Sequence, residues 1–212
     1  MENPVIIFGA NVLGRVAKEI FESNEVVVYG FLDDNKKLHS TEIDDVVVLG
    51  GTDDDGFLKL IGKKCEAFVA MDDNKVRKSI VTMLHEVRHT QPVNATHRLA
   101  SLSAKGTIGY GNLFDAGFTS GAGSVIGNHC ILGAKSHMGA ESTVGDFVQV
   151  GPGAIVNPGV TIEDEVFIGS GAIIVSGVVV GKGARIGAGS VVIGTVKAGS
   201  TVFGNPAQPV KS

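Results

Sequence analysis

Residues 126–145 read IGNHCILGAKSHMGAESTVG, and this stretch repeats one pattern every six residues. A large apolar residue recurs at each sixth position between Ile108 and Ala198, in fourteen of the sixteen places. The residue directly after it is glycine in eleven of the sixteen, as at Gly127. Four residues after each repeated apolar position, the chain usually carries a small or β-branched residue, as at Ser136 after Leu132. A short fixed period of this kind is typical of a solenoid.

The period of six matches neither an α-helix nor a plain alternating strand. Within each six-residue unit, the repeated apolar residue and the residue two places before it face the core, and the residue between them faces out. This is the alternation of a β-strand, but it lasts for only three residues. We expect the glycine that interrupts this alternation to take the positive φ value of a sharp corner. Three such sides close one coil, and residues 108–199 therefore predict about five coils of a left-handed parallel β-helix. A flexible glycine-rich segment, the alternative, would not keep its apolar residues in register over so many repeats.

The first half of the chain has a different composition. Residues 1–100 contain sixteen acidic residues, twelve basic residues and seven glycines, whereas residues 101–212 contain six of each charge and twenty-three glycines. A change of this size indicates two domains. We predict an α/β domain over residues 1–95 and an all-β domain over residues 96–212.

Short apolar runs and amphipathic spacing predict a small α/β sheet in the first domain. Strands are expected at residues 4–8, 25–29, 46–49 and 66–71, and helices at residues 12–23 and 74–86. The order strand, helix, strand predicts parallel pairing, so this lobe is expected to be a small Rossmann-like open sheet. Ligands of such sheets bind at the carboxyl ends of the strands, where helix amino termini favour phosphates.

Two features lie at those strand ends. Gly9 and Gly14 form a G-x-x-x-x-G spacing between the first strand and the first helix, and Asp33 and Asp34 follow the second strand. Acidic side chains at this place can accept hydrogen bonds from ribose hydroxyls or a base. Both features also occur without a ligand, as a simple strand-to-helix turn and as a solvated acidic loop. They leave nucleotide binding open.

Charge, cysteine content and hydropathy exclude several classes of function. A formal net charge of −4 without a basic stripe argues against nucleic-acid binding. No apolar run is long enough to span a bilayer, so no membrane insertion is expected. Only Cys65 and Cys130 are present, which fits a reducing cytoplasm rather than a disulfide framework. The repeat contains only two histidines, His129 and His137, so neither a metal site nor a zinc-dependent carbonic anhydrase is expected.

Runs such as IGNHCI, VGDFVQ, IGSGAI and IGAGSV, with the ending GNPAQPV, resemble the hexapeptide-repeat acyltransferases. Together with GFLDDN, VLGG and FVAMDDNKVRKSI, they make nearly the whole chain similar to the bacterial sugar acetyltransferases of the PglD and NeuD type. The resemblance implies a homotrimer formed through β-helix faces, acetyl-CoA as co-substrate and no metal. It also implies acetylation of a nucleotide-activated amino sugar for surface polysaccharide or protein glycan.

The resemblance also implies particular residues for each site. The sugar nucleotide is expected at Asn11, Asp33, Asp34 and Gly51. CoA is expected to lie against a subunit boundary at Gln149, Ser170 and Ala188.

The expected catalytic pair departs from the family. Relatives use a histidine as base, followed by an acidic residue, and these positions are Ala140 and Glu141 here. A methyl group cannot accept a proton, so His137, three residues earlier, is the candidate base. The resemblance therefore predicts an acetyltransferase with impaired or altered catalysis. The alternative is an inactive trimeric scaffold that still binds CoA or a nucleotide.

Overall fold

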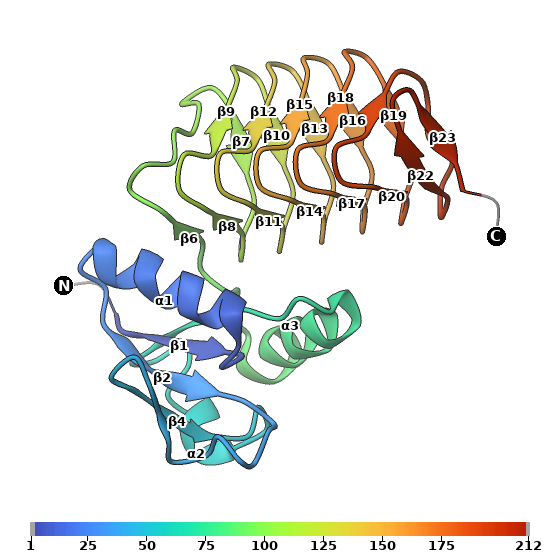
Figure 1. Cartoon of the computed structure of the whole chain (residues 1–212). Coiled ribbons are helices and arrows are strands. Elements are labelled where there is room, and N and C mark those ends of the chain that lie inside the picture. Colours follow the sequence, from blue (N-terminus) through green and yellow to red (C-terminus); the bar gives the residue numbers. More distant parts are fainter. Residues whose placement is uncertain (1–2, 211–212) are drawn as a thin grey trace. The chain divides into compact units, whose positions relative to one another are not determined.

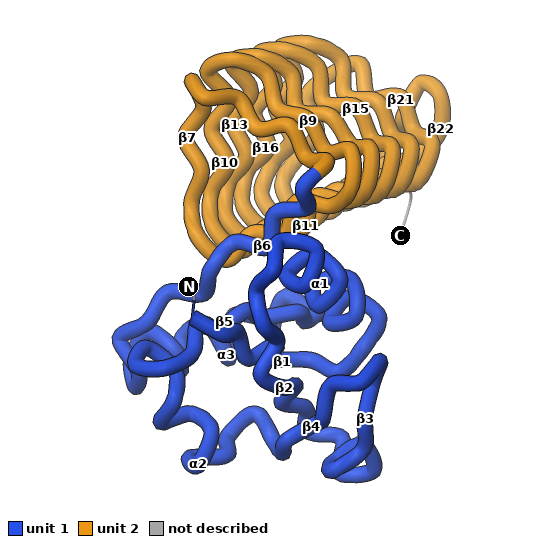
Figure 2. Tube along the Cα trace, turned by 90° about the vertical axis from the view of Figure 1, so that its left-hand side faces the viewer, with its two compact units in different colours: residues 1–98 blue, residues 99–212 orange. Residues whose placement is uncertain are grey.

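A computed structural model describes residues 3–210, and the chain divides into two compact units. The division falls between Arg98 and Leu99 (Figure 2). The sequence analysis placed the boundary between residues 95 and 96.

Unit 1 is an open, mostly parallel sheet (Figure 1). The strand order is β3-β4-β2-β1-β5, and every pair is parallel except β3 with β4. All four residues of β1 are buried, as expected for a central parallel strand covered on both faces. The strands are β1 (Val5–Phe8), β2 (Val28–Leu32), β3 (Glu42–Ile43), β4 (Val46–Gly50) and β5 (Glu66–Val69). The predicted Rossmann-like sheet is confirmed.

Two longer helices and one short helix connect these strands. The helices are α1 (Val12–Ser23), α2 (Asp55–Leu58) and α3 (Asn74–Arg88), and a two-residue strand, β6 (Ala95–Thr96), follows them. The bounds of α1 are those predicted. The second strand begins later than predicted, because Asn24 caps α1, Glu25 turns with φ of 63° and Val27 is 68% exposed. The short elements β3 and α2 were not predicted.

Unit 2 is a parallel β-helix built from two-residue strands. Strands eighteen residues apart pair in parallel, as Val125 pairs with Thr143, so each coil takes the predicted eighteen residues. Figure 1 shows the coils stacked in sequence order. One sheet contains β7 (Thr107–Ile108), β10 (Val125–Ile126), β13 (Thr143–Val144), β16 (Thr161–Ile162) and β19 (Val179–Val180). A second contains β9 (Thr119–Ser120), β12 (His137–Met138), β15 (Ile155–Val156), β18 (Ile173–Ile174) and β21 (Val191–Val192).

The third side of the β-helix ends in a hairpin. This side contains β8 (Leu113–Phe114), β11 (Ile131–Leu132), β14 (Gln149–Val150), β17 (Phe167–Ile168), β20 (Arg185–Ile186) and β22 (Thr201–Gly204). Its last strand, β23 (Ala207–Pro209), runs antiparallel to β22. The apolar residue of each repeat and the small residue four places later both face the core, as Met138 and Ser142 do with 0% exposure. The predicted inward pattern is confirmed.

The expected role of the repeat glycines was wrong. Between Gly109 and Gly187, the glycine directly after the repeated apolar residue does not adopt positive φ; that conformation falls two residues later, at Gly153 and even at Glu141. The first kind of glycine is required because the next coil passes directly over it. A Cβ on Gly139 would lie 2.4 Å from the backbone nitrogen of Pro158, and one on Gly151 would lie 2.5 Å from the next coil's backbone. Close backbone approach, rather than φ, explains this glycine.

Candidate functional site

Four turns meet at the carboxyl edge of the sheet in unit 1, as parallel strands require. Residues 9–11 follow β1, residues 33–35 follow β2, residues 51–52 follow β4 and residues 70–73 follow β5. The strand order reverses between β1 and β5, because β2 and β4 extend to one side of β1 and β5 lies on the other. Open α/β sheets bind ligands in the crevice at such a reversal.

The packing of the turn explains why glycine occupies both positions of the G-x-x-x-x-G spacing. Gly9 has φ of 111°, and a Cβ there would lie 2.5 Å from the carbonyl oxygen of Ala70. A Cβ on Gly14 would lie 2.0 Å from the carbonyl oxygen of Gly9. The spacing therefore allows β1, its turn and α1 to pack closely, and it does not by itself indicate a ligand.

The two predicted aspartates hold the turns in place. The Ala10 N–H donates to Asp33 Oδ2 at 2.9 Å, which ties the β1 turn to the β2 turn. Asp34 Oδ1 accepts from both the backbone N–H and the hydroxyl of Thr52, each at 2.8 Å. These bonds fix the turns before any ligand arrives. Asp34 is also exposed, so its carboxylate can accept further hydrogen bonds.

A pocket of about 530 Å³ opens beside Asp34 and Gly51. Two of the four predicted substrate residues therefore lie in one pocket, whereas Asn11 and Asp33 are not among its lining residues. The His39 ring Nε2 lies 2.7 Å from the carbonyl oxygen of Asp33. Among the other lining residues, Leu49 and Gly50 end β4, whereas Lys36, His39, Ser40, Asp53 and Asp54 lie outside the strands, where no periodic pattern singles them out. The lining consists of Asp34, Lys36, His39, Ser40, Leu49, Gly50, Gly51, Asp53 and Asp54.

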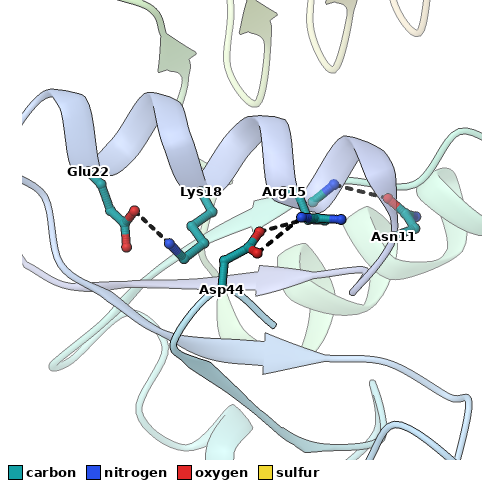
Figure 3. Close-up of polar contacts among 6 residues, drawn as sticks. Asn11, Arg15, Lys18, Glu22 and Asp44 are labelled. Atoms are coloured by element: carbon teal, nitrogen blue, oxygen red, sulfur yellow. Dashed lines mark hydrogen bonds and ion pairs between the residues drawn. The ribbon is translucent and has the colours of Figure 1, made fainter. Parts of the chain in front are cut away.

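Asn11 caps α1 (Figure 3) and also bonds to the turn that follows β5. Its Oδ1 accepts from the Gly14 N–H at 3.0 Å, and its Nδ2 donates to the Ala70 carbonyl oxygen at 3.0 Å. Both polar atoms therefore have partners within the fold. Asn11 connects the β5 turn to the start of α1, so its side chain shapes the crevice.

The three helices of unit 1 differ in the charge at their amino ends. Asn11, the cap of α1, is neutral, and the first turn of α1 has no acidic residue. The caps of α2 and α3 are Asp54 and Asp73, whose carboxylates accept from the helix N–H groups. A carboxylate occupies the place that an anion would take and satisfies the same dipole. The amino end of α1 is therefore the one suited to a phosphate.

Two ion pairs lie along α1 beyond this end (Figure 3). Arg15 Nε lies 2.7 Å from Asp44 Oδ2, and hydrogen bonding to Arg15 lowers the pKa of the Asp44 carboxyl. Lys18 Nζ lies 2.6 Å from Glu22 Oε2. Both cations are therefore paired with acids of this unit.

In unit 2, the candidate base His137 lies in β12 and is half-buried. Its Nδ1 lies 2.7 Å from the hydroxyl oxygen of Thr119, its register partner in β9. Glu141 is exposed at the following corner with φ of 56°, next to the half-buried Ala140. The structure thus joins His137 to Thr119, a residue that the sequence analysis did not single out.

The three residues expected to face CoA occupy two parts of the β-helix surface. Gln149 lies half-buried in β14, between its register partners Ile131 and Phe167. Ser170 and Ala188 are exposed at one corner in successive coils. The Gly189 N–H donates to the Ser170 carbonyl oxygen at 2.9 Å, so the structure brings this corner pair together.

Within residues 3–210, no group of three or more His, Cys, Asp or Glu side chains could hold a metal ion. His129 is buried instead with its ring 5.0 Å from that of Phe147. No helix in the described part of the chain is long and apolar enough to cross a membrane.

Both units match families of known proteins. Residues 4–84 match the PglD N-terminal domain, and residues 141–175 and 159–194 match the bacterial transferase hexapeptide (six repeats). No match was found among curated proteins.

Solved structures resemble the chain over its full length. The acetyltransferase domain of PglB from Neisseria gonorrhoeae in complex with acetyl coenzyme A is 27% identical, with a TM-score of 0.90 over 99% of this chain and 100% of that one. PerB from Caulobacter crescentus in complex with CoA and GDP-perosamine is 25% identical, with a TM-score of 0.89 over 100% of this chain and 99% of that one. WeeI from Acinetobacter baumannii is 26% identical, with a TM-score of 0.84 over 98% of this chain and 99% of that one. The chain therefore combines a PglD N-terminal domain with the hexapeptide repeats of bacterial transferases.

Proposed function

We propose that this protein transfers the acetyl group of acetyl-CoA to a nucleotide-activated amino sugar, as a step in building a surface glycan. The observation that carries the proposal is the full-length likeness to structures that hold acetyl-CoA, or CoA with GDP-perosamine. The likeness covers both units of the chain.

The sugar nucleotide is assigned to the carboxyl edge of unit 1. Its diphosphate binds at the amino end of α1, where the cap is neutral and the first turn has no acidic residue. Asp34, at the mouth of the pocket with Gly51, accepts hydrogen bonds from the ribose or the base. Asn11 and Asp33 act by holding the turns that form the crevice.

The chemistry is assigned to the β-helix. The acceptor amine attacks the thioester carbonyl carbon, the carbon–sulfur bond breaks, and the amine loses a proton while the CoA sulfur leaves as a thiol or thiolate. His137 accepts that proton at Nε2, which requires the tautomer whose Nδ1–H donates to Thr119. Glu141, exposed at the next corner, stabilises the resulting positive charge. Because Ala140 replaces the base of the relatives, this arrangement is expected to be slower.

CoA is assigned to Gln149, Ser170 and Ala188, where backbone groups at a β-helix corner can bind the pantetheine arm. We propose that a neighbouring subunit forms the other wall in a homotrimer. Cys65 and Cys130 are both buried and are not joined in a disulfide, which fits a cytoplasmic enzyme.

Turnover tests the proposal directly. The protein is incubated with acetyl-CoA and a panel of UDP-, GDP- and dTDP-linked amino sugars, and the release of free CoA thiol is followed. Thiol release is expected with one acceptor class and not with the matching sugar that has a hydroxyl in place of the amine. Binding of both substrates by calorimetry without thiol release would instead support the inactive scaffold.

A further inference from the structure

A buried arginine lies behind the turn that follows β5. Arg77, in α3, is only 1% exposed. Its guanidinium donates to the carbonyl oxygen of Met71 and to the side-chain oxygen of Asn74. These two residues flank the turn between β5 and α3. One side chain therefore holds both ends of residues 71–74.

The same turn is held from the opposite side. Asn11 donates to the carbonyl oxygen of Ala70, and Gly9 packs against that carbonyl. The turn is thus connected to the start of α1 through Asn11 and to α3 through Arg77. Since the strand order reverses between β1 and β5, residues 70–74 form the second lip of the crevice. None of them is among the substrate residues assigned above.

Energetics argue that Arg77 serves more than packing. Burying a guanidinium costs several kcal/mol of desolvation, and apolar side chains of similar volume often stabilise a fold as well or better. A helix that only needed to cover the sheet would be served by Leu or Met at this position. A rigid fork of N–H donors can instead fix several backbone and amide oxygens in one geometry.

We propose that residues 71–74 contact the sugar nucleotide, and that Arg77 is the positioning residue that sets the conformation of this lip. The inference rests on the proposed function, because it needs a sugar nucleotide in the crevice. Asp72 and Asp73 are exposed on the lip, and a carboxylate that caps a helix with one oxygen, as Asp73 does with Oδ1, can still accept from a ligand at its other oxygen.

Calorimetry with UDP, GDP and dTDP tests the role of Arg77. In Arg77→Lys and Arg77→Met, the Kd for the nucleotide that binds the wild type is expected to rise at least about tenfold. The Kd for CoA is expected to stay unchanged, and Arg77→Met is expected to melt no lower than Arg77→Lys. If the enzyme turns over, KM for the sugar nucleotide should rise while KM for acetyl-CoA does not.

Arg88→Lys on the same helix is the matched control. Arg88 Nη2 donates to the Ile61 carbonyl oxygen at 3.3 Å, beside the segment before β5 rather than at its carboxyl end. Nucleotide affinity in this variant should match the wild type. Arg77 variants that fold and bind the nucleotide within twofold of the wild type would overturn the positioning role. Failure of the wild type to bind any of the three nucleotides would refute the nucleotide site of the proposed function as well.

Hydrogen exchange on the unmodified protein covers the case in which the Arg77 variants do not fold. Adding the nucleotide is expected to slow amide exchange in peptides that span residues 70–74. Unchanged exchange there, with slowed exchange at the start of α1, would show that the ligand does not contact this lip.

Discussion

At one corner of the β-helix, polar side chains from successive coils form a ladder. The Asn128 N–H and side-chain amide both donate to Asp146 Oδ1, at 2.7 and 3.0 Å, and the Asp146 N–H donates to Asp164 Oδ1 at 3.0 Å. Lys182 lies at the end of the ladder, within ion-pair distance of Asp164 and Glu165. A hydrogen bond to Glu165, together with the negative charges of Glu165 and Asp164, raises the pKa of the Lys182 amine. Each carboxylate thus bonds the coil before it.

Replacing Asp146 by alanine should weaken this connection between coils. Two donors on Asn128 would lose their acceptor. A hydrogen bond to a charged group contributes about 1.5–3 kcal/mol to the free energy of unfolding. We expect Asp146→Ala to lower the free energy of unfolding by about 1–3 kcal/mol, measured by urea denaturation. Asp146→Asn keeps an oxygen acceptor and should lose less. If both variants lost the same free energy of unfolding, the charge of the Asp146 carboxylate, rather than the position of its oxygen, would stabilise the coils.

The base position offers a gain-of-function test. Ala140 is half-buried at the corner that follows β12, and it is the position at which the family resemblance predicts a base. General-base catalysis contributes about 10²–10⁴-fold, so Ala140→His is expected to raise kcat by about 10²-fold in the thiol-release assay. In a His137→Ala background, the same substitution should restore activity.

Two outcomes would contradict this argument. If Ala140→His changes nothing while His137→Ala abolishes turnover, the chemistry is centred on His137 alone. If neither substitution changes kcat, no group near this corner accepts the proton. The pH profile of kcat/KM separates the cases, because only a working histidine base adds a deprotonation step that must precede turnover.

At the scale of the coil, the two kinds of glycine should respond differently to an added methyl group. A Cβ on Gly139 would lie within 2.5 Å of backbone atoms of Asn157 and Pro158, and backbone cannot move aside without breaking the coil. Gly153 has φ of 68° and open space around it. Gly153→Ala should therefore cost only the left-handed conformation, about 1–2 kcal/mol. Gly139→Ala should cost clearly more or prevent folding, as measured by thermal unfolding.

Gly153→Asn refines the comparison, since asparagine tolerates the left-handed region better than alanine does. It should unfold at a higher temperature than Gly153→Ala. Equal destabilisation by Gly139→Ala and Gly153→Ala would show that the coils can move apart enough to accommodate a methyl group.

The elements that were predictable from sequence have strong periodicity or caps. The six-residue period determines the β-helix and its register, and Asn11 with the amphipathic spacing determines α1. The second strand was misplaced because Val26 and Val27 look like strand residues, although Glu25 turns the chain there. The short α2 is too brief for a periodic signal.

The candidate site was predictable only in part, because some of its residues follow strands and others lie on a loop. Asp33 and Asp34 follow a strand, so the rule for parallel sheets places them at the ligand edge. Lys36 and His39 enter the pocket through the path of a loop, which no pattern encodes. The Thr119 contact of His137 depends on a register of eighteen residues, and it could have been found by writing the coils one above another.

For the whole molecule, two of the outer faces of the β-helix differ in chemistry. In the sheet from β9 to β21, His137, Ile155, Ile173 and Val191 follow one another in register. Ile155 is 39% exposed although it is aliphatic. The corresponding positions on another side carry Gln149, Phe167 and Arg185. An aliphatic line on an outer face favours burial against another subunit, so we expect this face to form the trimer contact.

Ile155→Glu combined with Ile173→Glu tests this assignment, because a carboxylate in each of three identical contacts would be desolvated without a partner. Light scattering should give three times the 21.9 kDa chain for the wild type and a single chain for the double variant. Thr143→Glu, on a different face, is the control and should leave the trimer intact. Since His137 pairs in register with Ile155, the same double variant should also lose acetyl transfer while its unit 1 still binds nucleotide. A trimer that survives both glutamates would place the contact on another side of the β-helix and separate His137 from the subunit boundary.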